Sequence, residues 1–487
     1  MFLRARRLAL SGLLLSAFLF AQSEDTFTAK QRMARIRELG KKDNGAIPAL
    51  TQYLSDSNRD IRAEAVKAIV KIGTEASLGP LVTATHDNDS EIQIRATDGL
   101  TNYYLPGYVA RGGLTGSPSR GMRQVKSLFP SRNDQIIDPG VTIRPDVGDA
   151  IAAEIIGGAS VDGRSNSARA AGILRDRTAV PSLEKAVHAK DSQLIFESLV
   201  ALQKIRDVSA GPATASAAHD LDERVQATAL ETVGVLHSVP SAPDVRSALS
   251  NAHSLRIRRA ALEALAMLAV PVDRSIFQKY LGDGDSDVRA AALEGLGRLR
   301  EPEDFPAIQG AYNEKGADWK VHLAAAFALV NEGKVDTSEF SPLLYLMENL
   351  DMKGHANVAS AYLTEVARRD DVRRALFPLV AQATKAQKIE LCGIFGASGS
   401  EDVVPTLNIL SRDIDPDVAL AASKALKVTQ SHNRAGGEGT RLRMETLLHA
   451  RTVSPECPRG AFPGLPRKGR IEGVTLLSSV FADQHES

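Results

Sequence analysis

Hydrophobic positions recur along most of the chain with the spacing of one helical face. An aliphatic residue, called the anchor below, is followed four positions later by a small residue and eight positions later by a second aliphatic residue. Such positions form one stripe on an α-helix, and the small central residue allows another helix to approach closely. The eight triplets are Ile61/Ala65/Ile69, Ile92/Ala96/Leu100, Leu194/Ser198/Leu202, Val225/Ala229/Val233, Ile257/Ala261/Leu265, Val288/Ala292/Leu296, Val321/Ala325/Leu329 and Val418/Ala422/Leu426.

Polar residues mark where each of these helices begins. Three residues before every anchor stands a side chain that suits an N-cap, because its oxygen can accept a backbone N–H of the first turn. These residues are Asn58, Asp89, Asp191, Asp222, Ser254, Asp285, Asp318 and Asp415. Farther upstream, a proline is predicted to open a preceding helix. These prolines are Pro48, Pro80, Pro181, Pro212, Pro243, Pro306 and Pro405.

The repeating unit is therefore a helix, a short turn and a capped helix. In uninterrupted runs the anchors are 31 to 33 residues apart. Weaker copies of the unit are expected near residues 164–175, 355–366 and 388–395. A two-helix unit of this length cannot bury its own apolar face, so neighbouring units must stack. The pattern predicts an all-α fold, a curved α-solenoid.

Two sequence phrases carry a family resemblance. Asp287-Val288-Arg289 with Ala292, and the segment Ala179-Val180-Pro181-Ser182-Leu183, resemble the HEAT repeats of the bacterial phycobilisome-lyase-like group. The resemblance covers roughly residues 30 to 428. It implies a right-handed α-solenoid of HEAT-like two-helix repeats of about 31 residues, with one long loop insertion. Such repeats serve many purposes, so the resemblance implies little about activity.

The repeat is interrupted once and stops before the end of the chain. The anchors Ile92 and Leu194 are 102 residues apart, about 40 more than two units need. The excess is rich in Gly and Pro and lacks helical periodicity, which is typical of a long loop. The predicted organisation is a signal peptide (1–21), N-terminal repeats (22–103), a loop insertion (104–147), the main repeat array (148–428) and a C-terminal tail predicted to be disordered (429–487).

The loop insertion is basic and aromatic. Residues 107–133 carry five Lys or Arg side chains and no acid. Long loops in compact repeats are often functional, so we expect a recognition arm with Arg for anionic groups and Tyr for stacking. The alternative is a solvated insertion that its aromatic residues hold down. The predicted partner-binding residues are Tyr103, Tyr104, Tyr108, Arg111, Arg120, Arg123, Lys126, Phe129 and Arg132.

The N-terminus predicts export. Arg4, Arg6 and Arg7 precede an apolar run, Leu8–Phe20, and the small residue Ala21 offers a cleavage site, as in a secretory signal peptide. The run falls short of the roughly 20 residues that a spanning helix needs. We therefore expect a periplasmic or extracellular protein with no membrane span after cleavage.

Charge and composition limit the kinds of partner that we expect this chain to bind. Lys plus Arg and Asp plus Glu number 59 each, so no overall field attracts nucleic acid or anionic lipid. Aromatic residues make up only 5% of the chain, and two cysteines cannot build a disulfide framework. With export, these features make a nucleic-acid partner unexpected.

Candidate metal sites in the sequence have structural explanations. Asp283–Glu294 resembles a calcium loop, but its sixth position is Val288 instead of Gly, and Asp285 and Val288 are the cap and anchor of a repeat. The segments His86–Asp89 and His219–Asp222 fall on the equivalent turn. We therefore expect no metal site.

No catalytic centre is evident either. HEAT-like deoxyhypusine hydroxylases hold a di-iron centre with His-Glu pairs, but the one such pair in this chain is His485-Glu486, in the tail. Hydrolase, metalloprotease and phosphate-loop motifs are also absent from the sequence. We expect no cofactor and no catalytic residue.

The leading hypothesis is an exported, non-catalytic scaffold that binds a protein or peptide on its concave face, with the insertion as recognition arm. One alternative is an enzyme or enzyme-associated subunit, lyase-like or hydroxylase-like, with a site near the insertion. A second is a polyanion-binding protein that uses the basic arm. The sequence leaves the oligomeric state open.

Overall fold

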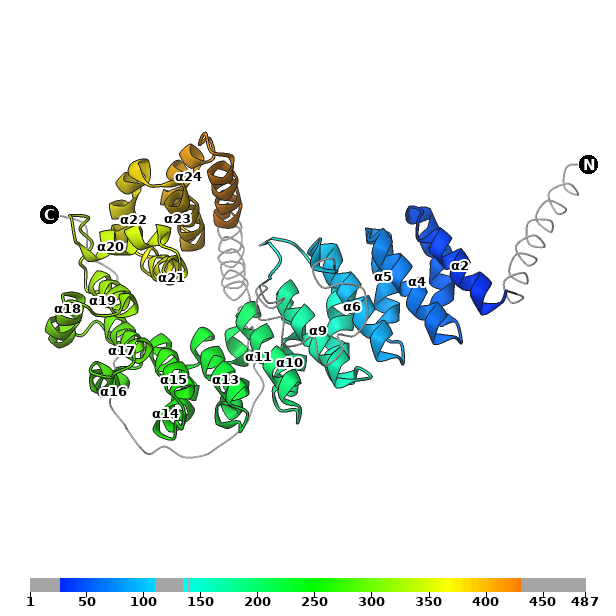
Figure 1. Ribbon diagram of the computed structural model, residues 1–487, viewed down its shortest axis with the longest axis horizontal. Coiled ribbons are helices and arrows are strands. Elements are labelled where there is room, and N and C mark those ends of the chain that lie inside the picture. Colours follow the sequence, from blue (N-terminus) through cyan, green and yellow to red (C-terminus); the bar gives the residue numbers. More distant parts are fainter. Residues whose placement is uncertain (1–26, 110–134, 139, 431–487) are drawn as a thin grey trace, which may run out of the picture. The chain divides into compact units, whose positions relative to one another are not determined.

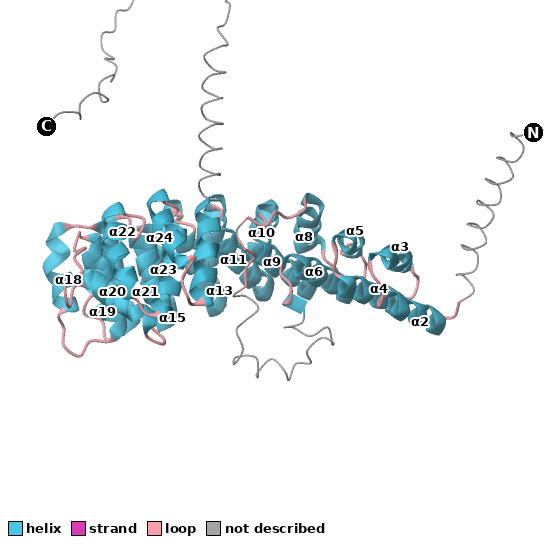
Figure 2. Cartoon of the chain, turned by 90° about the horizontal axis from the view of Figure 1, so that it is seen from above, coloured by secondary structure: helices cyan, strands magenta, loops and turns pink. Residues whose placement is uncertain are grey.

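The computed structural model describes residues 27–109, 135–138 and 140–430, and within these ranges the chain is an all-α solenoid of stacked helix pairs (Figures 1 and 2). Helix α2 (Ala29–Leu39) precedes the first pair. The first helices of the pairs are α3 (Ile47–Gln52), α5 (Glu75–Ala84), α8 (Pro145–Gly157), α10 (Val180–Val187), α12 (Gly211–Thr214), α14 (Ala242–Ser250), α16 (Arg274–Tyr280), α18 (Phe305–Tyr312), α20 (Pro342–Glu348), α22 (Asp370–Leu376) and α24 (Val404–Leu410).

The second helices are longer and form a continuous row in which each packs against the next. They are α4 (Arg59–Ile72), α6 (Ser90–Tyr104), α9 (Val161–Leu174), α11 (Ser192–Ile205), α13 (Glu223–Val235), α15 (Leu255–Leu268), α17 (Ser286–Leu299), α19 (Trp319–Asn331), α21 (Ala356–Val366), α23 (Lys385–Ser398) and the helix over residues 416–430.

Short 3-10 helices flank most of the first helices. They are η1 (Asn44–Ala46), η2 (Tyr53–Ser55), η6 (Arg177–Ala179), η7 (Val208–Ala210), η8 (Ala215–His219), η9 (Val239–Ser241), η10 (Pro271–Asp273), η11 (Pro302–Asp304), η12 (Asn349–Asp351), η13 (Phe377–Gln382) and η14 (Glu401–Val403). Among the described residues, no helix combines the length and apolar character that a bilayer crossing requires.

The predicted stripe is the core of the solenoid. The anchors, small residues and second aliphatic residues of the eight triplets are buried, with the exception of Leu426, which is partly buried in the last described helix. The three weaker units correspond to α9, α21 and α23. The repeat frame predicted from the sequence is therefore confirmed.

The helix starts follow from the predicted caps. All eight N-cap side chains accept a hydrogen bond from a backbone N–H of the first turn; Asp89, for example, accepts from Glu91 at 3.1 Å and Ile92 at 3.2 Å. The prediction that Pro80 opens a helix is wrong, because Pro80 lies inside α5. Thr74 and Ser77 form a capping box that starts this helix at Glu75 instead.

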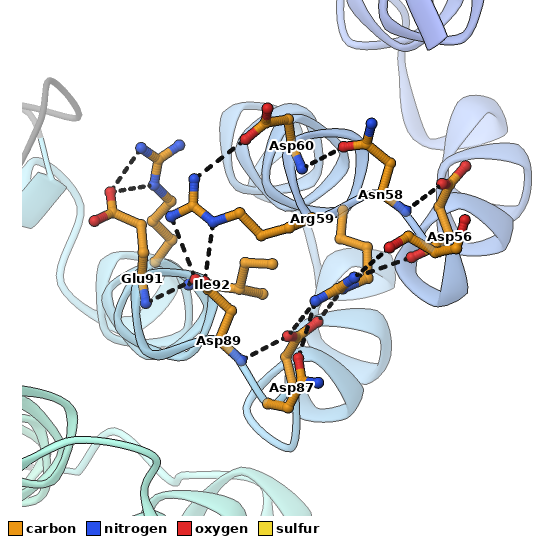
Figure 3. A network of polar contacts seen from close by, with 12 residues as sticks. Asp56, Asn58, Arg59, Asp60, Asp87, Asp89, Glu91 and Ile92 are labelled. Atoms are coloured by element: carbon orange, nitrogen blue, oxygen red, sulfur yellow. Dashed lines mark hydrogen bonds and ion pairs between the residues drawn. The ribbon is translucent and has the colours of Figure 1, made fainter. Parts of the chain in front are cut away.

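Ion pairs join successive repeats, and the same caps take part (Figure 3). Arg59 Nε donates to Asp89 at 2.9 Å, and Arg62 Nε donates to Asp87 at 2.6 Å. Later in the chain Arg259 contacts Asp285 in the same way. All three acidic turns that resembled metal sites therefore cap a helix, and those at Asp89 and Asp285 also bind an arginine of the preceding repeat.

Candidate partner-binding surface

The described ends of the loop insertion meet where it leaves and re-enters the array. Helix α6 ends at Tyr104 and α8 begins at Pro145. The Tyr104 hydroxyl accepts a hydrogen bond from the Arg144 backbone N–H at 3.0 Å, which ties the exit to the return. The Tyr103 and Tyr104 rings lie edge to face at 5.0 Å, and both remain partly exposed.

Deeper parts of the insertion are fastened to second helices. Tyr108 is only 1% exposed and belongs to the hydrophobic core. The Ile137 N–H donates to the Ile173 carbonyl of α9 at 3.0 Å, and Lys204 Nζ of α11 donates to the Gln135 carbonyl at 3.2 Å. The insertion is thus anchored near the C-terminal ends of α9 and α11.

The predicted partner-binding residues fall into two groups. Tyr103, Tyr104 and Tyr108 lie at the anchored base of the insertion, and Tyr108 is committed to the core. The binding role of all nine residues stays a prediction. Those that lie outside the described residues are Arg111, Arg120, Arg123, Lys126, Phe129 and Arg132.

Polar side chains form a hydrogen-bonded chain across the second helices beside this base. Asn166 of α9 donates to Asp98 of α6 at 3.1 Å. Arg169 of α9 contacts Glu197 of α11 with N–O distances of 2.5 and 3.2 Å. Glu197 also accepts from Gln193 at 2.8 Å. Because these groups satisfy one another, they hold a fixed pattern of charge along the row.

The chain extends onto α13 through an arginine. Arg224 Nη2 donates to Gln193 Oε1 at 3.1 Å, and its guanidinium lies 4.5 Å from the centre of the Phe196 ring. Arg224 stands one residue before the α13 anchor, on the same side as the other members of the chain. The second helices from α6 to α13 therefore share one polar surface.

Three glutamates continue this surface on α13, α15 and α17. Glu231, Glu263 and Glu294, here called the acidic row, each stand six residues after their anchor. Burial raises the pKa of Glu263 to about 7, and the negative charges of Glu294 and Glu231 add to this. Burial also raises the pKa of Glu231, against the effect of Arg256. The row is thus a surface on which carboxylates crowd one another.

An arginine network closes the acidic row at α17. Arg298 donates to Glu294 at 3.0 Å and to Glu365 of α21 at 2.8 Å, with its guanidinium 4.9 Å from the Phe327 ring centre. The Tyr362 hydroxyl donates to Glu294 at 2.5 Å, and its ring stacks on Phe327 at 4.7 Å. This network ties α17 to α21, two second helices farther along the row.

A buried acid lies between α8 and α6. Glu154 of α8 is 4% exposed and accepts a hydrogen bond from the Thr97 hydroxyl at 2.6 Å. Burial raises its pKa to about 7, and the hydrogen bonds that it accepts only partly oppose this. Within the described residues no group of three His, Cys, Asp or Glu side chains is arranged to hold a metal.

Sequence reasoning missed the acidic row, although a signal for it was present. The three glutamates follow one another at intervals of 32 and 31 residues, the interval of the repeat itself. Comparing positions that point away from the core, as well as the anchors, would have found them. The link between Arg298 and Glu365 leaves no such signal, because 67 residues separate the two.

Comparison with known proteins identifies the repeats. Residues 16–101 and 242–330 match the family model for HEAT repeats. These two segments are HEAT repeats. No curated protein matches the sequence.

Solved structures with similar folds have low sequence identity to this chain. The complex of CpcE and CpcF of phycocyanin lyase from Nostoc sp. PCC7120 is 18% identical, covers 59% of this chain and 94% of its own, and has a TM-score of 0.32. Kap121p bound to Pho4p is 11% identical, with coverage of 88% and 58% and a TM-score of 0.40. These similarities are too low to extend a function to this chain.

Proposed function

We propose that this chain is an exported, non-catalytic scaffold that binds an extended protein or peptide partner along its row of second helices, with the insertion as recognition arm. The supporting observation is that the returning end of the insertion is fastened to two second helices that carry the polar surface described above. Gln135 accepts a hydrogen bond from Lys204 of α11, and the Ile137 N–H donates to Ile173 of α9. An arm anchored there begins beside the surface that a partner would contact.

The charge pattern of the row supports an ordered binding mode. Arg169 of α9 is ion-paired with Glu197 of α11, whereas Glu231 of α13 and Glu263 of α15 form no ion pair in the described part of the chain. A partner that follows the row would meet a charge-paired stretch and then unpaired carboxylates, a difference that would favour one direction and register. A rigid stack of helices presents these groups with little ordering cost on binding.

Site-specific crosslinking tests where the partner binds. A photoreactive residue replaces Val200, which is partly exposed six residues after the α11 anchor, or Lys185, which is exposed on the first helix α10. We expect the purified mature chain to capture a partner from cell envelopes through position 200 and not through position 185. Equal capture through both positions would contradict binding along the second helices.

The contribution of the insertion needs a deletion that preserves its anchors. Residues 110–134 are replaced by a short Gly-Ser linker, while Tyr108 and Ile137 remain because both are buried. Loss of crosslinking at position 200 would support the arm, and unchanged crosslinking would show that the row binds without it. A purified chain that retains stoichiometric metal or turns over a substrate would refute the scaffold hypothesis.

Export is a separate part of the proposal and has its own test. The prediction rests on residues 1–21, which lie outside the described residues. Cleavage after Ala21 predicts a secreted or periplasmic chain whose N-terminus is Gln22. N-terminal sequencing of the protein from a fractionated culture would show this residue, and an intact Met1 in the cytoplasmic fraction would contradict export.

A further inference from the structure

An aromatic patch lies on first helices α18 and α20 and on the loop that joins α19 to α20. Its members are Tyr312, Phe340 and Tyr345. The Tyr345 ring lies edge to face with Tyr312 at 5.9 Å, and the Tyr312 hydroxyl donates to the Phe340 carbonyl at 2.9 Å. Phe340 is 82% exposed, and both tyrosines are partly exposed. In a chain with 5% aromatic residues, this is a concentrated apolar surface.

Folding stability does not explain why phenylalanine stands at position 340. Its φ is 64°, a left-handed conformation that glycine adopts without strain and that a side chain disfavours. Because the ring is largely exposed, little burial compensates for this strain. Next to it, the hydroxyl of Ser341, which is 5% exposed, has no hydrogen-bond partner in the described part of the chain. The exposed, strained Phe340 and the unpaired Ser341 hydroxyl are both features that contact with a ligand would explain.

The segment that contains Phe340 and Tyr345 is rich in acids that form no ion pair with another described residue. Residues 335–352 contain four acidic side chains and no Lys or Arg. None of the four forms an ion pair among the described residues, whereas Asp285 and Asp304 in the preceding repeats are each bound by an arginine. The four acids are Asp336, Glu339, Glu348 and Asp351.

Two of these acids lie close to the aromatic rings. Burial raises the pKa of Tyr312 to about 12, and the charges of Tyr345, Glu348 and Asp336 contribute to this. A cation placed there would gain from both carboxylates and ring faces. An apolar side chain beside this cation would cover Phe340.

We propose that the aromatic patch is a docking surface for a positively charged segment of a partner protein, with lysine or arginine side chains alternating with apolar ones. Charge complementarity selects this occupant: residues 332–353 carry five acids against two cations, Lys334 and Lys353, and the patch exposes apolar rings. The surface belongs to α18, α20 and the loop that joins α19 to α20, so it is separate from the second-helix surface proposed above.

The chain contains one tryptophan, Trp319, which serves as a reporter. Its ring stacks on His355 at 4.1 Å. His355 Nδ1 lies 2.7 Å from Asn349 Oδ1, and Asn349 Nδ2 donates to the Tyr345 carbonyl at 2.8 Å. Trp319 is therefore connected to the patch through two residues, and occupation of the patch should change its fluorescence.

The test titrates the full mature chain with a ten-residue peptide in which lysine and leucine alternate. A peptide with glutamate in place of each lysine is the charge control. We expect saturable binding of the lysine peptide alone, weakened by added salt because the charges are exposed. Equal binding of both peptides, or no binding of the lysine peptide at low salt, would overturn the proposal.

Two patch variants and two controls locate the binding. Phe340→Gly keeps the left-handed backbone and should weaken binding at least tenfold without lowering the melting temperature. The double variant E339Q/E348Q should do the same while retaining the ring. Leu221→Ser, at a fully exposed loop position, controls for loss of an exposed apolar side chain.

The other control, E231Q/E263Q, changes the acidic row on the second helices. If this variant lost binding while the patch variants retained it, the peptide would bind the acidic row and not the patch. That result would overturn the proposal. A mass that increases with protein concentration in the wild type and falls to that of the monomer in Phe340→Gly would show that a second copy occupies the patch, which would also overturn it.

Discussion

The tightest approach of a glycine to the backbone of a neighbouring second helix, among the described residues, provides a sharp test of the stacking. A Cβ atom built on Gly297 of α17 would lie 2.5 Å from both Cα and Cβ of Ala328 on α19. The equivalent contact between Gly172 of α9 and Ala201 of α11 is 2.7 Å for the Cα atom. Because Ala328 Cα belongs to the backbone, rotation of a side chain cannot relieve the clash. Gly297→Ala must therefore separate α17 from α19.

Two opposing effects set the magnitude. Alanine is better than glycine inside a helix by about 1 kcal/mol. Overpacking a close-packed interface costs about 1–3 kcal/mol, and a clash with backbone atoms belongs at or beyond the upper end of that range. The helices also lose dispersion contacts along their whole interface when they separate. We expect a net destabilisation of about 2 kcal/mol.

Local hydrogen exchange measures this effect better than global melting, because long repeat arrays do not unfold in one step. Peptides from α17 and α19 should exchange roughly 30-fold faster in Gly297→Ala, since 1.4 kcal/mol corresponds to a factor of ten. Gly310→Ala on α18 is the matched control: nothing lies within 4 Å of its added Cβ. That variant should slow exchange locally, and slower or unchanged exchange in Gly297→Ala would refute the packing argument.

Three further predictions use other parts of the repeat. Ala292→Leu and Ala261→Leu, both at 0% exposure, should each cost about 1–3 kcal/mol in urea unfolding; two unchanged midpoints would contradict the packing of this stripe. Ala269→Gly should stabilise by about 1 kcal/mol, because φ is 50° at this helix end and Gly73 fills the same place after α4; a lower melting temperature would contradict this. Glu154→Gln should reduce the dependence of folding stability on pH. Because its pKa is raised to about 7 in the folded chain, Glu154 binds a proton more tightly there than in the unfolded chain. The free energy of unfolding therefore falls as pH rises from about 4.5 to 7. Melting at pH 5 and pH 8 should show a smaller difference in the variant, and an equal difference would reject the assignment.

The repeat frame could be predicted because its determinants are local. An N-cap such as Asp285, an anchor such as Val288 and a small residue such as Ala292 lie within one helix, and every repeat imposes the same requirement on them. The pattern weakened at α9, where glycine and serine occupy anchor and small positions: Gly163 and Ser167 are still buried there. Small residues pack as well as aliphatic ones when helices approach closely, but they do not produce a hydrophobic signal.

The candidate surface could be predicted only in part. The insertion was visible as an interruption, yet its attachment through Gln135 to Lys204 joins residues 69 positions apart. Likewise, the exposed ring of Phe340 follows from a loop conformation that its neighbours in sequence do not determine. Contacts of this kind depend on which helices the stacking brings together, so they become visible only in the folded chain.

The distribution of charge separates what maintains this fold from what is free for binding. Asp87, Asp89 and Asp285 each receive hydrogen bonds from a helix start or an arginine of the preceding repeat, so stacking accounts for them. Stacking does not account for Glu263 in this way. Burial and neighbouring carboxylates raise its pKa to about 7, which means that its ionised form opposes folding at neutral pH. A group that destabilises the fold and joins no repeats needs another reason to be there. Binding of a positively charged partner would be a sufficient reason, because the partner's charge would offset the repulsion among the carboxylates of the acidic row.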